Sequence, residues 1–241
     1  MENWFGSPFY KILYQNRDDF EAQEFVENLL EYLQPPPGSA MLDIACGEGR
    51  FGKQLAEHGF DVTGIDISHE SIETAKAFES GNLQFFVHDM RFPFYINYFG
   101  YAFNFFTSFG YFQHDRDHAL AARSFAAALK NNGILVIDYL NFEQVLANFV
   151  PHENIQRGNY LFNIKRKIER KHIIKEISFL DAQKKQRHYT ESVAAFSLAD
   201  FIKMFKSTDL SLINTFGDYQ LSSYHPIDSP RLIMIFKKKY A

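Results

Sequence analysis

Several features that would mark other classes of protein are scarce or missing in this sequence. Its single cysteine, Cys46, excludes an intrachain disulfide and a metal site built from several cysteines. No segment offers the ~20 consecutive apolar residues that a membrane helix requires, and the N-terminus lacks the basic start and apolar run of a signal peptide. No spacing of histidines and acidic residues resembles a metal site. We therefore expect a cytoplasmic protein with no membrane partner and no metal.

An excess of charge of one sign is also missing. The 241 residues carry a formal net charge of −4, and charged residues make up 22% of them, as in an ordinary soluble globular protein. A nucleic-acid partner would favour a basic face, so we expect none. The stretch KRKIERKHIIK (Lys165–Lys175) resembles a nucleic-acid patch, but its interleaved isoleucines indicate strands with a solvated basic face.

Aromatic side chains, by contrast, are abundant, and apolar residues follow regular patterns. The chain holds 27 Phe and 13 Tyr, enough to line a surface as well as a core. Short apolar runs predict strands at residues 40–45, 62–67, 83–87, 101–107 and 134–139. Amphipathic stretches predict helices at residues 20–33, 50–58, 70–78 and 118–129. Strands that alternate with helices in this way indicate βαβ units and a parallel sheet.

The pattern changes in the second half of the chain. From Arg157 to Phe196, apolar and polar residues alternate with the period of half-exposed antiparallel strands. No linker rich in Pro, Gly or Ser separates this stretch, so we expect an inserted antiparallel β-layer in the same domain. A helix capped by Ser197, followed by strands at residues 210–216 and 232–236, completes the chain.

The stretch LDIACGEGRFG contains a G-x-G-x-x-G at Gly47, Gly49 and Gly52. In a parallel α/β sheet, this turn at the end of the first strand is where a nucleotide-like ligand binds. In a dinucleotide site, such a turn holds a pyrophosphate at the helix N-terminus. Asp43 and Glu48 would place two carboxylates beside that anion, and like charges a few ångströms apart cost on the order of several kcal/mol at low dielectric.

Asp43 instead suits a ligand that bears an ammonium group, while the glycines allow the backbone to approach a small zwitterion closely. Asp66, nineteen residues beyond Gly47, ends the second strand and can accept both hydroxyls of a ribose. Asp66 alone would fit NAD equally well. Together, Asp43 and Asp66 describe an adenosine that carries an amino acid, which is S-adenosylmethionine.

With these residues, the order of motifs resembles the class I S-adenosylmethionine-dependent methyltransferases. LDIACGEGR is followed by VTGIDIS, HDM and NNGILVIDYLN, and the match runs from about residue 10 to residue 240. FTSFGYF and SPRLIMIFKK look like a bacterial small-molecule subgroup with an inserted β-layer. The resemblance implies an α/β fold with a Rossmann-like seven-stranded mixed sheet whose last strand is antiparallel, plus the inserted antiparallel β-layer.

The resemblance also implies how the chain is divided. We expect a single methyltransferase domain over residues 1–241. Its parts are an N-terminal lid and helix (1–38), a cofactor-binding core (39–150), the inserted β-layer (151–197), and a final helix and β-hairpin (198–241). Tyr10, Tyr14 and Arg17 fall where the subgroup lays its lid over the cofactor.

Carried over residue by residue, the resemblance implies a cofactor site along the first four strands. Asp43 would line the methionine part, Asp66 would hold the ribose, and Ile67 would lie against the adenine. Asp89 would take the adenine amino group, and Phe106 would help to close the pocket. The implied cofactor-binding residues are Tyr14, Asp43, Ala45, Cys46, Gly47, Gly49, Asp66, Ile67, Asp89, Met90, Phe106 and Ser108.

The expected chemistry is in-line transfer of a methyl group from the sulfonium to a small-molecule N, O or C nucleophile. An amine acceptor needs only to lose its proton, whereas a hydroxyl or carbon acid needs a base. The candidates for that base are His114, Tyr139 and His225. Further candidates for the acceptor wall are Asn141, Tyr219 and Tyr224. Phe109, Tyr111 and Phe112 could either pack in the core or stabilise the sulfonium by cation–π contact.

Other functions remain open on the same residues. One is an NAD-dependent oxidoreductase, and another is a non-catalytic cofactor-binding protein on the same fold. An RNA methyltransferase is a variant of the first interpretation. The exposed antiparallel strands could also pair between subunits, so a homodimer is a further expectation.

Overall fold

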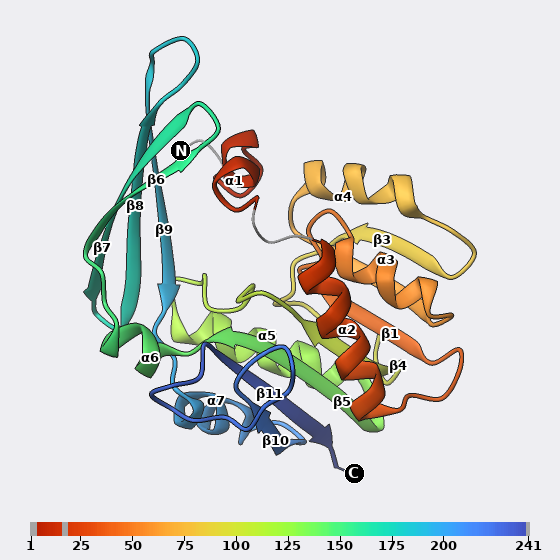
Figure 1. Ribbon diagram of the computed structural model, residues 1–241. Coiled ribbons are helices and arrows are strands. Elements are labelled where there is room, and N and C mark those ends of the chain that lie inside the picture. Colours follow the sequence, from red (N-terminus) through yellow and green to blue (C-terminus); the bar gives the residue numbers. More distant parts are fainter. Residues whose placement is uncertain (1–3, 16–18, 240–241) are drawn as a thin grey trace.

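The computed structural model describes residues 4–15 and 19–239 of the chain. These residues form two sheets, with helices on both faces of the larger one (Figure 1). The strands of the larger sheet are β1 (Ala40–Ile44), β2 (Asp61–Asp66), β3 (Leu83–Val87), β4 (Phe99–Asn104), β5 (Leu129–Leu140), β10 (Leu210–Phe216) and β11 (Arg231–Lys238). They lie in the order β10-β11-β5-β4-β1-β2-β3.

The direction of the strands confirms the predicted mixed sheet. The first five strands, β1 to β5, run parallel, so their carboxyl ends meet at one edge. The last strand, β11, runs antiparallel to its neighbours β5 and β10. Seven strands with an antiparallel last member are therefore present, as expected from the sequence.

Two groups of helices cover the larger sheet. The residues of α2 (Asp19–Leu33), α3 (Arg50–Glu57) and α4 (His69–Ala75) pack into one apolar cluster on one face. Those of α5 (Asp115–Ala128) and α7 (Leu198–Phe205) pack into a second cluster on the other face. A 3-10 turn, Lys76–Phe78, continues α4, and α6 (Phe142–Ala147) leads from β5 to the second sheet.

Local signals explain where two of these helices begin. The side chain of Ser68 accepts the backbone N–H of Ser71 at the start of α4. At the start of α7, Ser197 and Asp200 form a reciprocal capping box. Such caps satisfy backbone donors that have no partner within the helix. The predicted cap at Ser197 is confirmed.

Two strand boundaries differ from the expectation. The strand predicted to reach residue 107 ends at Asn104, because Phe106 and Thr107 take left-handed backbone angles (φ 53° and 58°) that no strand contains. The strand expected from residue 134 begins at Leu129, directly after α5. A register shift between β4 and β5 accommodates this early start.

The smaller sheet confirms the predicted antiparallel layer. It consists of β6 (His152–Arg157), β7 (Tyr160–Glu169), β8 (His172–Leu180) and β9 (Gln186–Ala194), paired in that order as antiparallel neighbours. One face of this sheet carries an apolar cluster that includes Phe162, Ile177, Phe179 and Tyr189. Trp4 and Leu13 from the N-terminal segment complete that cluster.

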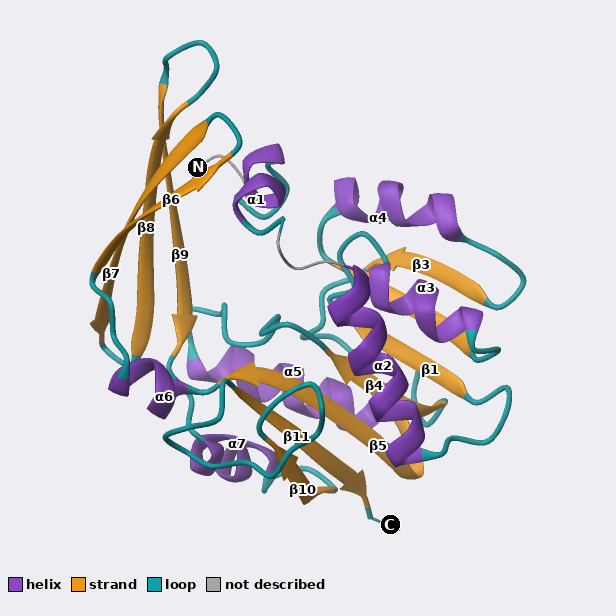
Figure 2. Cartoon of the chain, viewed as in Figure 1, coloured by secondary structure: helices purple, strands orange, loops and turns teal. Residues whose placement is uncertain are grey.

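The N-terminal helix α1 (Pro8–Leu13) therefore rests on the smaller sheet, and it lies between that sheet and the helices of the larger one (Figure 2). At the other end of β8 and β9, Ile173 and Val193 join the cluster beneath α5 and α7. The smaller sheet thus packs onto the core of the larger sheet near Ile173 and Val193, and onto the N-terminal segment near Ile177 and Tyr189.

Candidate functional site

The glycine turn between β1 and α3 lies at the carboxyl edge of the parallel strands. Ala45, Gly47 and Gly49 all have positive φ, at 60°, 57° and 84°. A Cβ atom at Gly49 would lie only 2.5 Å from Cζ of Phe85, so a larger residue cannot stand there without displacing the ring of Phe85 on β3. Glycine at this position is required both by the backbone angle and by the packing against β3.

Cys46 lies within the turn but is not placed for chemistry. Its side chain is buried, and its backbone N–H donates to the carbonyl of Ile65 on β2. Burial, followed by the nearby carboxylates of Asp43 and Asp66, raises the pKa of the thiol well above 9.0. A thiolate is therefore disfavoured, and Cys46 acts as a small packing residue beside the site.

Asp43 on β1 is the most unusual group at this edge. The residue is only 1% exposed, and among the described residues its Oδ2 has no hydrogen-bond partner. Burial raises the pKa of the carboxyl group from 3.8 to about 7, with a further increase from Asp66. The backbone N–H of Gly52 and the charge of Arg50 act in the opposite direction. A buried polar atom without a partner is rare in native proteins and calls for a ligand or another explanation.

Asp66 at the end of β2 supports the turn directly. Its Oδ2 accepts the N–H of Gly47 at 2.9 Å, and its Oδ1 accepts the N–H of Ser68 at 2.8 Å. Each carboxylate oxygen can accept a second hydrogen bond, so the group can still receive ligand hydroxyls. The neighbouring Ile67 is 68% exposed, which leaves an apolar side chain open beside the carboxylate.

The predicted adenine residues follow β3. Both carboxylate oxygens of Asp89 face Arg91, whose Nε donates to Oδ2 at 2.9 Å, and this hydrogen bond is the main cause of a lowered pKa of Asp89. Met90 is half-buried and packs against the cluster beneath α5. The pairing with Arg91 was not expected from the sequence, and the role of Asp89 towards adenine stays a prediction.

The predicted pocket residues Phe106 and Ser108 lie in the turn that follows β4, the strand next to β1. The ring of Phe106 stands 4.9 Å from the guanidinium carbon of Arg50 and 5.4 Å from the ring of Phe51. Ser108 donates its hydroxyl to the carbonyl of Phe105 at 2.8 Å, which closes the turn. Arg50 was missed from the sequence, and its charge reaches Asp43.

The N-terminal segment contacts this edge from the other side. Lys11 on α1 forms an ion pair with Glu48 of the glycine turn, with 2.5 Å between Nζ and Oε1. Tyr14 donates its hydroxyl to Glu191 on β9 at 2.8 Å, and it is also hydrogen-bonded to Lys175 on β8. Arg17, the third predicted lid residue, lies outside the described residues.

Glu191 on β9 is bonded to several residues that join the N-terminal segment to the smaller sheet. Besides Tyr14, it accepts the indole N–H of Trp4 at 2.5 Å and pairs with Lys175 at 3.2 Å. The carboxylate is almost completely buried. Since the sequence places Trp4 and Glu191 187 positions apart, no local pattern could have predicted this contact.

Tyr139 is a correction to the predicted candidate bases. Side chains alternate between the two faces of a strand, so Tyr139 points away from the face that carries Asp138 and into the cluster with Phe201. It is 0% exposed, it donates its hydroxyl to the carbonyl of Ala194 at 2.5 Å, and burial raises its pKa well above 10. It can therefore neither line the acceptor wall nor act as a ready base.

Three further acceptor-wall candidates serve the loop between β10 and β11. The side-chain amide of Asn141 donates to the carbonyls of Pro226 and Ser229, both at 2.7 Å, and its oxygen accepts the hydroxyl of Tyr224 at 3.1 Å. Tyr219 donates its hydroxyl to Asp138 at 3.1 Å. These side chains fasten the loop, and their role as candidates for the acceptor wall stays a prediction.

The two candidate histidines are exposed. His114 is the N-cap residue of α5, and His225 lies in the β10–β11 loop. Of the three aromatics after β4, Phe109 is fully buried among the rings of α5 and α7, whereas Tyr111 is 37% exposed and contacts Phe5. The core interpretation holds for Phe109. The candidate role of the two histidines stays a prediction.

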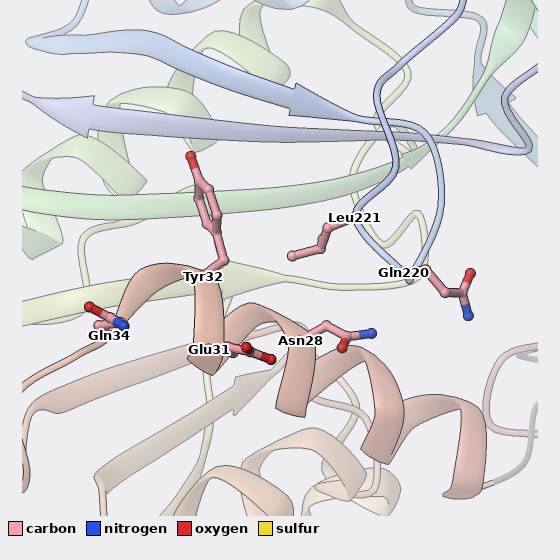
Figure 3. A pocket seen from close by; sticks show the side chains of 6 residues that line it. All are labelled: Asn28, Glu31, Tyr32, Gln34, Gln220 and Leu221. Carbon is pink, nitrogen blue, oxygen red and sulfur yellow. The ribbon is translucent and has the colours of Figure 1, made fainter.

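A depression lies at the surface between α2 and the β10–β11 loop. It is lined by side chains at the end of α2 and in the β10–β11 loop (Figure 3). The lining residues are Asn28, Glu31, Tyr32, Gln34, Gln220 and Leu221. None of the predicted site residues is among them, so we assign this depression no role.

Over residues 4–15 and 19–239, no three His, Cys, Asp or Glu side chains lie together as ligands of one metal ion would. In the same residues, no helix has both the length and the apolar character needed to cross a membrane.

Comparison with known proteins identifies a family whose model covers most of the chain. A family model described as a methyltransferase domain matches residues 14–215. The putative methyltransferase YqeM of Bacillus subtilis is 45% identical over 58 residues, which are 23% of this chain and 24% of that protein. Matches to curated relatives of this kind span about a quarter of the relatives' length.

Solved structures match over nearly the whole chain. An S-adenosylmethionine-dependent methyltransferase from Clostridium acetobutylicum has a TM-score of 0.81 at 18% identity, with 96% of each chain covered. SAM-bound CalS10, an amino pentose methyltransferase from Micromonospora echinaspora, has a TM-score of 0.73 at 16% identity and covers 97% of this chain and 98% of its own. At these identities the likeness establishes the fold.

The contacts of Glu191 generate a first prediction. Replacement of Glu191 by Ala removes the acceptor shared by Trp4, Tyr14 and Lys175, so we expect α1 to loosen from the smaller sheet. Trp4 is the only tryptophan of the chain, and its fluorescence emission should shift to longer wavelength with greater quenching by acrylamide. A matched control is Glu176→Ala on the opposite face of the same sheet, which should leave the emission unchanged. Identical spectra for Glu191→Ala and the wild type would contradict this account.

The buried carboxyl group of Asp43 leads to a second prediction, on how stability depends on pH. Its pKa of about 7 in the folded chain lies above the ordinary 3.8, so the folded state holds the proton more tightly and loses stability as the pH rises from about 4 to 7. The variant Asp43→Asn has no titrating carboxyl group at this position, so it does not lose this stability as the pH rises. Its unfolding free energy relative to the wild type should therefore rise between pH 4 and pH 8, by at most about 4 kcal/mol. Urea unfolding without ligand at both pH values measures it, and a pH-independent difference would refute the assignment.

Proposed function

The chain belongs to the methyltransferase domain family, and from this membership we propose that it transfers a methyl group from S-adenosylmethionine to a small-molecule nucleophile. The observation that carries the proposal is the unpartnered Oδ2 of buried Asp43, beside the glycine turn. An ammonium group that donates to this oxygen would satisfy it and hold the carboxyl in its charged form. A diphosphate would leave it unpartnered and would add negative charge next to it.

The neighbouring residues fit the rest of such a cofactor. Asp66 keeps free acceptor capacity for the ribose hydroxyls, and the exposed Ile67 offers an apolar surface to the adenine. Arg50, whose charge already acts on Asp43, would balance the carboxylate of the amino-acid end. Asp43, Arg50 and Asp66 would thus serve the ammonium group, the carboxylate and the ribose hydroxyls of S-adenosylmethionine, respectively. This set favours methyl transfer over an NAD-dependent oxidoreductase.

When bound, the cofactor supplies an activated methyl group, so the chain's own residues mainly orient the reactants and exclude water. We propose that α1 covers the cofactor edge, since Lys11 contacts the glycine turn and Tyr14 contacts the smaller sheet. The acceptor would then lie between the smaller sheet and the turn after β4.

The available bases point to an amine as the acceptor. Tyr139 is committed to the core, and the remaining candidates His114 and His225 are exposed imidazoles. A neutral amine attacks without a strong base, whereas a hydroxyl or a carbon acid requires one. Among the structural neighbours, CalS10 acts on an amino pentose and KedS8 is a sugar N-methyltransferase. These neighbours support a small amine-bearing acceptor.

We further propose that the protein acts in the cytoplasm and binds no nucleic acid. The basic stretch on β7 and β8 carries its own acidic partners, as in the pairs Arg166–Glu153 and Lys167–Glu176. Such pairing reduces the attraction of that face for a phosphate backbone. Salt-dependent RNA binding would speak for an RNA methyltransferase instead.

The assembly is a separate part of the proposal. We expect one domain per chain, because residues from both sheets share the cluster beneath α5 and α7, and we expect the domain to form a homodimer. Its surface carries exposed apolar side chains close together in the loop before β4, including Phe92, Tyr95 and Ile96. Sedimentation equilibrium of the wild type tests the homodimer, and a monomer at all concentrations would end that part of the proposal.

Binding of the cofactor is the direct test of function. Isothermal titration should show binding of S-adenosylmethionine and S-adenosylhomocysteine and none of NADH. A panel of small amines should then yield methylated product. Cofactor binding without any methyl transfer would favour the non-catalytic alternative, and NADH binding would favour the oxidoreductase.

The affinity for S-adenosylhomocysteine should depend on pH through Asp43. Below a pKa of about 7 the carboxyl is neutral, and its proton must leave before it can receive an ammonium ion. We therefore expect the Kd to rise roughly tenfold or more from pH 7.5 to pH 5.5. In Asp43→Asn the Kd should be higher at pH 7.5 and nearly constant over this range. Asp66→Asn is the control: it should weaken binding but still show a pH dependence, shifted to lower pH because the charge of Asp66 helps to raise the pKa of Asp43.

A further inference from the structure

The turn after β4 has a backbone conformation that its residues do not favour. Phe106 and Thr107 both lie in the left-handed region, and neither is glycine. A β-branched residue such as Thr107 is especially unfavourable there. Two such residues in succession persist only where surrounding groups hold them.

Asp138 on β5 is the group that holds this turn. It is 0% exposed, its Oδ2 accepts the N–H of Phe106 at 2.8 Å, and its own backbone carbonyl accepts the N–H of Thr107 at 2.9 Å. The hydroxyl of Tyr219 also donates to Oδ2, at 3.1 Å. Both strained residues are therefore bonded to one residue of the neighbouring strand.

Arg231 at the start of β11 completes the arrangement. Because β11 runs antiparallel to β5, its first residue lies at the same edge of the sheet as the end of β5. Its Nε donates to Oδ1 of Asp138 at 2.8 Å, and its Nη2 donates to the hydroxyl of Thr107 at 3.0 Å. The planar fork of a guanidinium can serve two acceptors in this way, whereas a lysine ammonium cannot do so with the same geometry.

The Phe106–Thr107 turn determines where the ring of Phe106 lies, and this ring forms part of the wall beside Asp43. The ring of Phe106 covers the guanidinium of Arg50 and contacts the ring of Tyr219 at 5.6 Å. Arg50 is the cation that acts on the buried carboxyl of Asp43. A change in the angles of the turn would move this ring away from Arg50 and widen the site.

We propose that Asp138 and Arg231 are positioning residues for methyl transfer, which hold the Phe106–Thr107 turn in its left-handed form and thereby set the wall of the cofactor site. The inference rests on the proposed function. Neither residue needs to touch cofactor or acceptor. Their effect passes through the backbone of the turn, which makes it separable from a general loss of stability.

A glycine substitution can separate a positioning effect from a general loss of stability, because glycine adopts positive φ without strain. In Arg231→Met the turn should relax, and the Kd for S-adenosylhomocysteine, measured by isothermal titration, should rise about fivefold or more. In the double variant Arg231→Met with Thr107→Gly, the turn regains its conformation without the guanidinium, and the Kd should return to within about twofold of the wild type. A residue that serves only stability would gain nothing from this glycine.

Lys238 on the same strand is the matched control. It is also a buried cation, bonded to the carbonyls of Ala126 and Leu129 at 2.8 Å, but it lies at the far end of β11. Lys238→Met should lower the melting temperature while the Kd stays at the wild-type value. If Arg231→Met fails to fold, Arg231→Lys keeps the charge opposite Asp138 but not the second donor to Thr107, and it should still raise the Kd.

The outcomes separate the two proposals. If the wild type does not bind S-adenosylhomocysteine, the proposed function is overturned and this inference with it. If the wild type binds, and the folded Arg231 variants bind equally well or are not rescued by Thr107→Gly, only the positioning role is overturned. A raised Kd that glycine restores supports it.

Discussion

A buried carboxylate with an oxygen that no other described residue bonds, that of Asp43, is the constraint on which the site depends. Three aspartates stand at the carboxyl edge of the parallel strands, one each on β1, β2 and β5. Asp66 receives two backbone N–H groups, and Asp138 receives a backbone N–H, a phenol and a guanidinium. The same side chain thus supports the turns in two places and is left open in the third. Only the partners distinguish these roles, since the residue type and the position along the strand are nearly the same.

The local part of this arrangement could be predicted from the sequence. The spacing of Asp43, the glycines and Asp66 depends on one strand–turn–helix unit and the strand that follows, so a linear pattern describes it well. The same is true of the mixed sheet and of the antiparallel layer, whose periods differ along the chain. Tyr139 was misjudged because a residue near a strand end can face the site or the opposite layer. For Tyr139 that choice is made by packing against Phe201 of α7.

Contacts between distant segments could not be predicted. Glu191 meets Trp4 and Tyr14 across most of the chain, and Arg231 meets Thr107 across 124 positions. One signal did exist for the second contact: an arginine at the first position of the last strand, which the antiparallel direction brings to the ligand edge. It could be interpreted only once the register of β11 on β5 was known. For Glu191 no comparable signal was present, because the partner segment precedes the fold's regular pattern.

These two long-range clusters hold different parts of the molecule. The cluster at Asp138 belongs to the larger sheet and holds the turn beside Asp43, which is the proposed cofactor end of the site. The cluster at Glu191 belongs to the smaller sheet and holds α1, which reaches back to the glycine turn through Lys11 and Glu48. A change in the inserted layer would therefore alter the acceptor side and its cover while Asp43, Asp66 and their turns stay in place. Under the proposed function, such a separation would allow one cofactor edge to serve different acceptors, because the proposed cofactor residues and the proposed acceptor side are held mainly by different clusters.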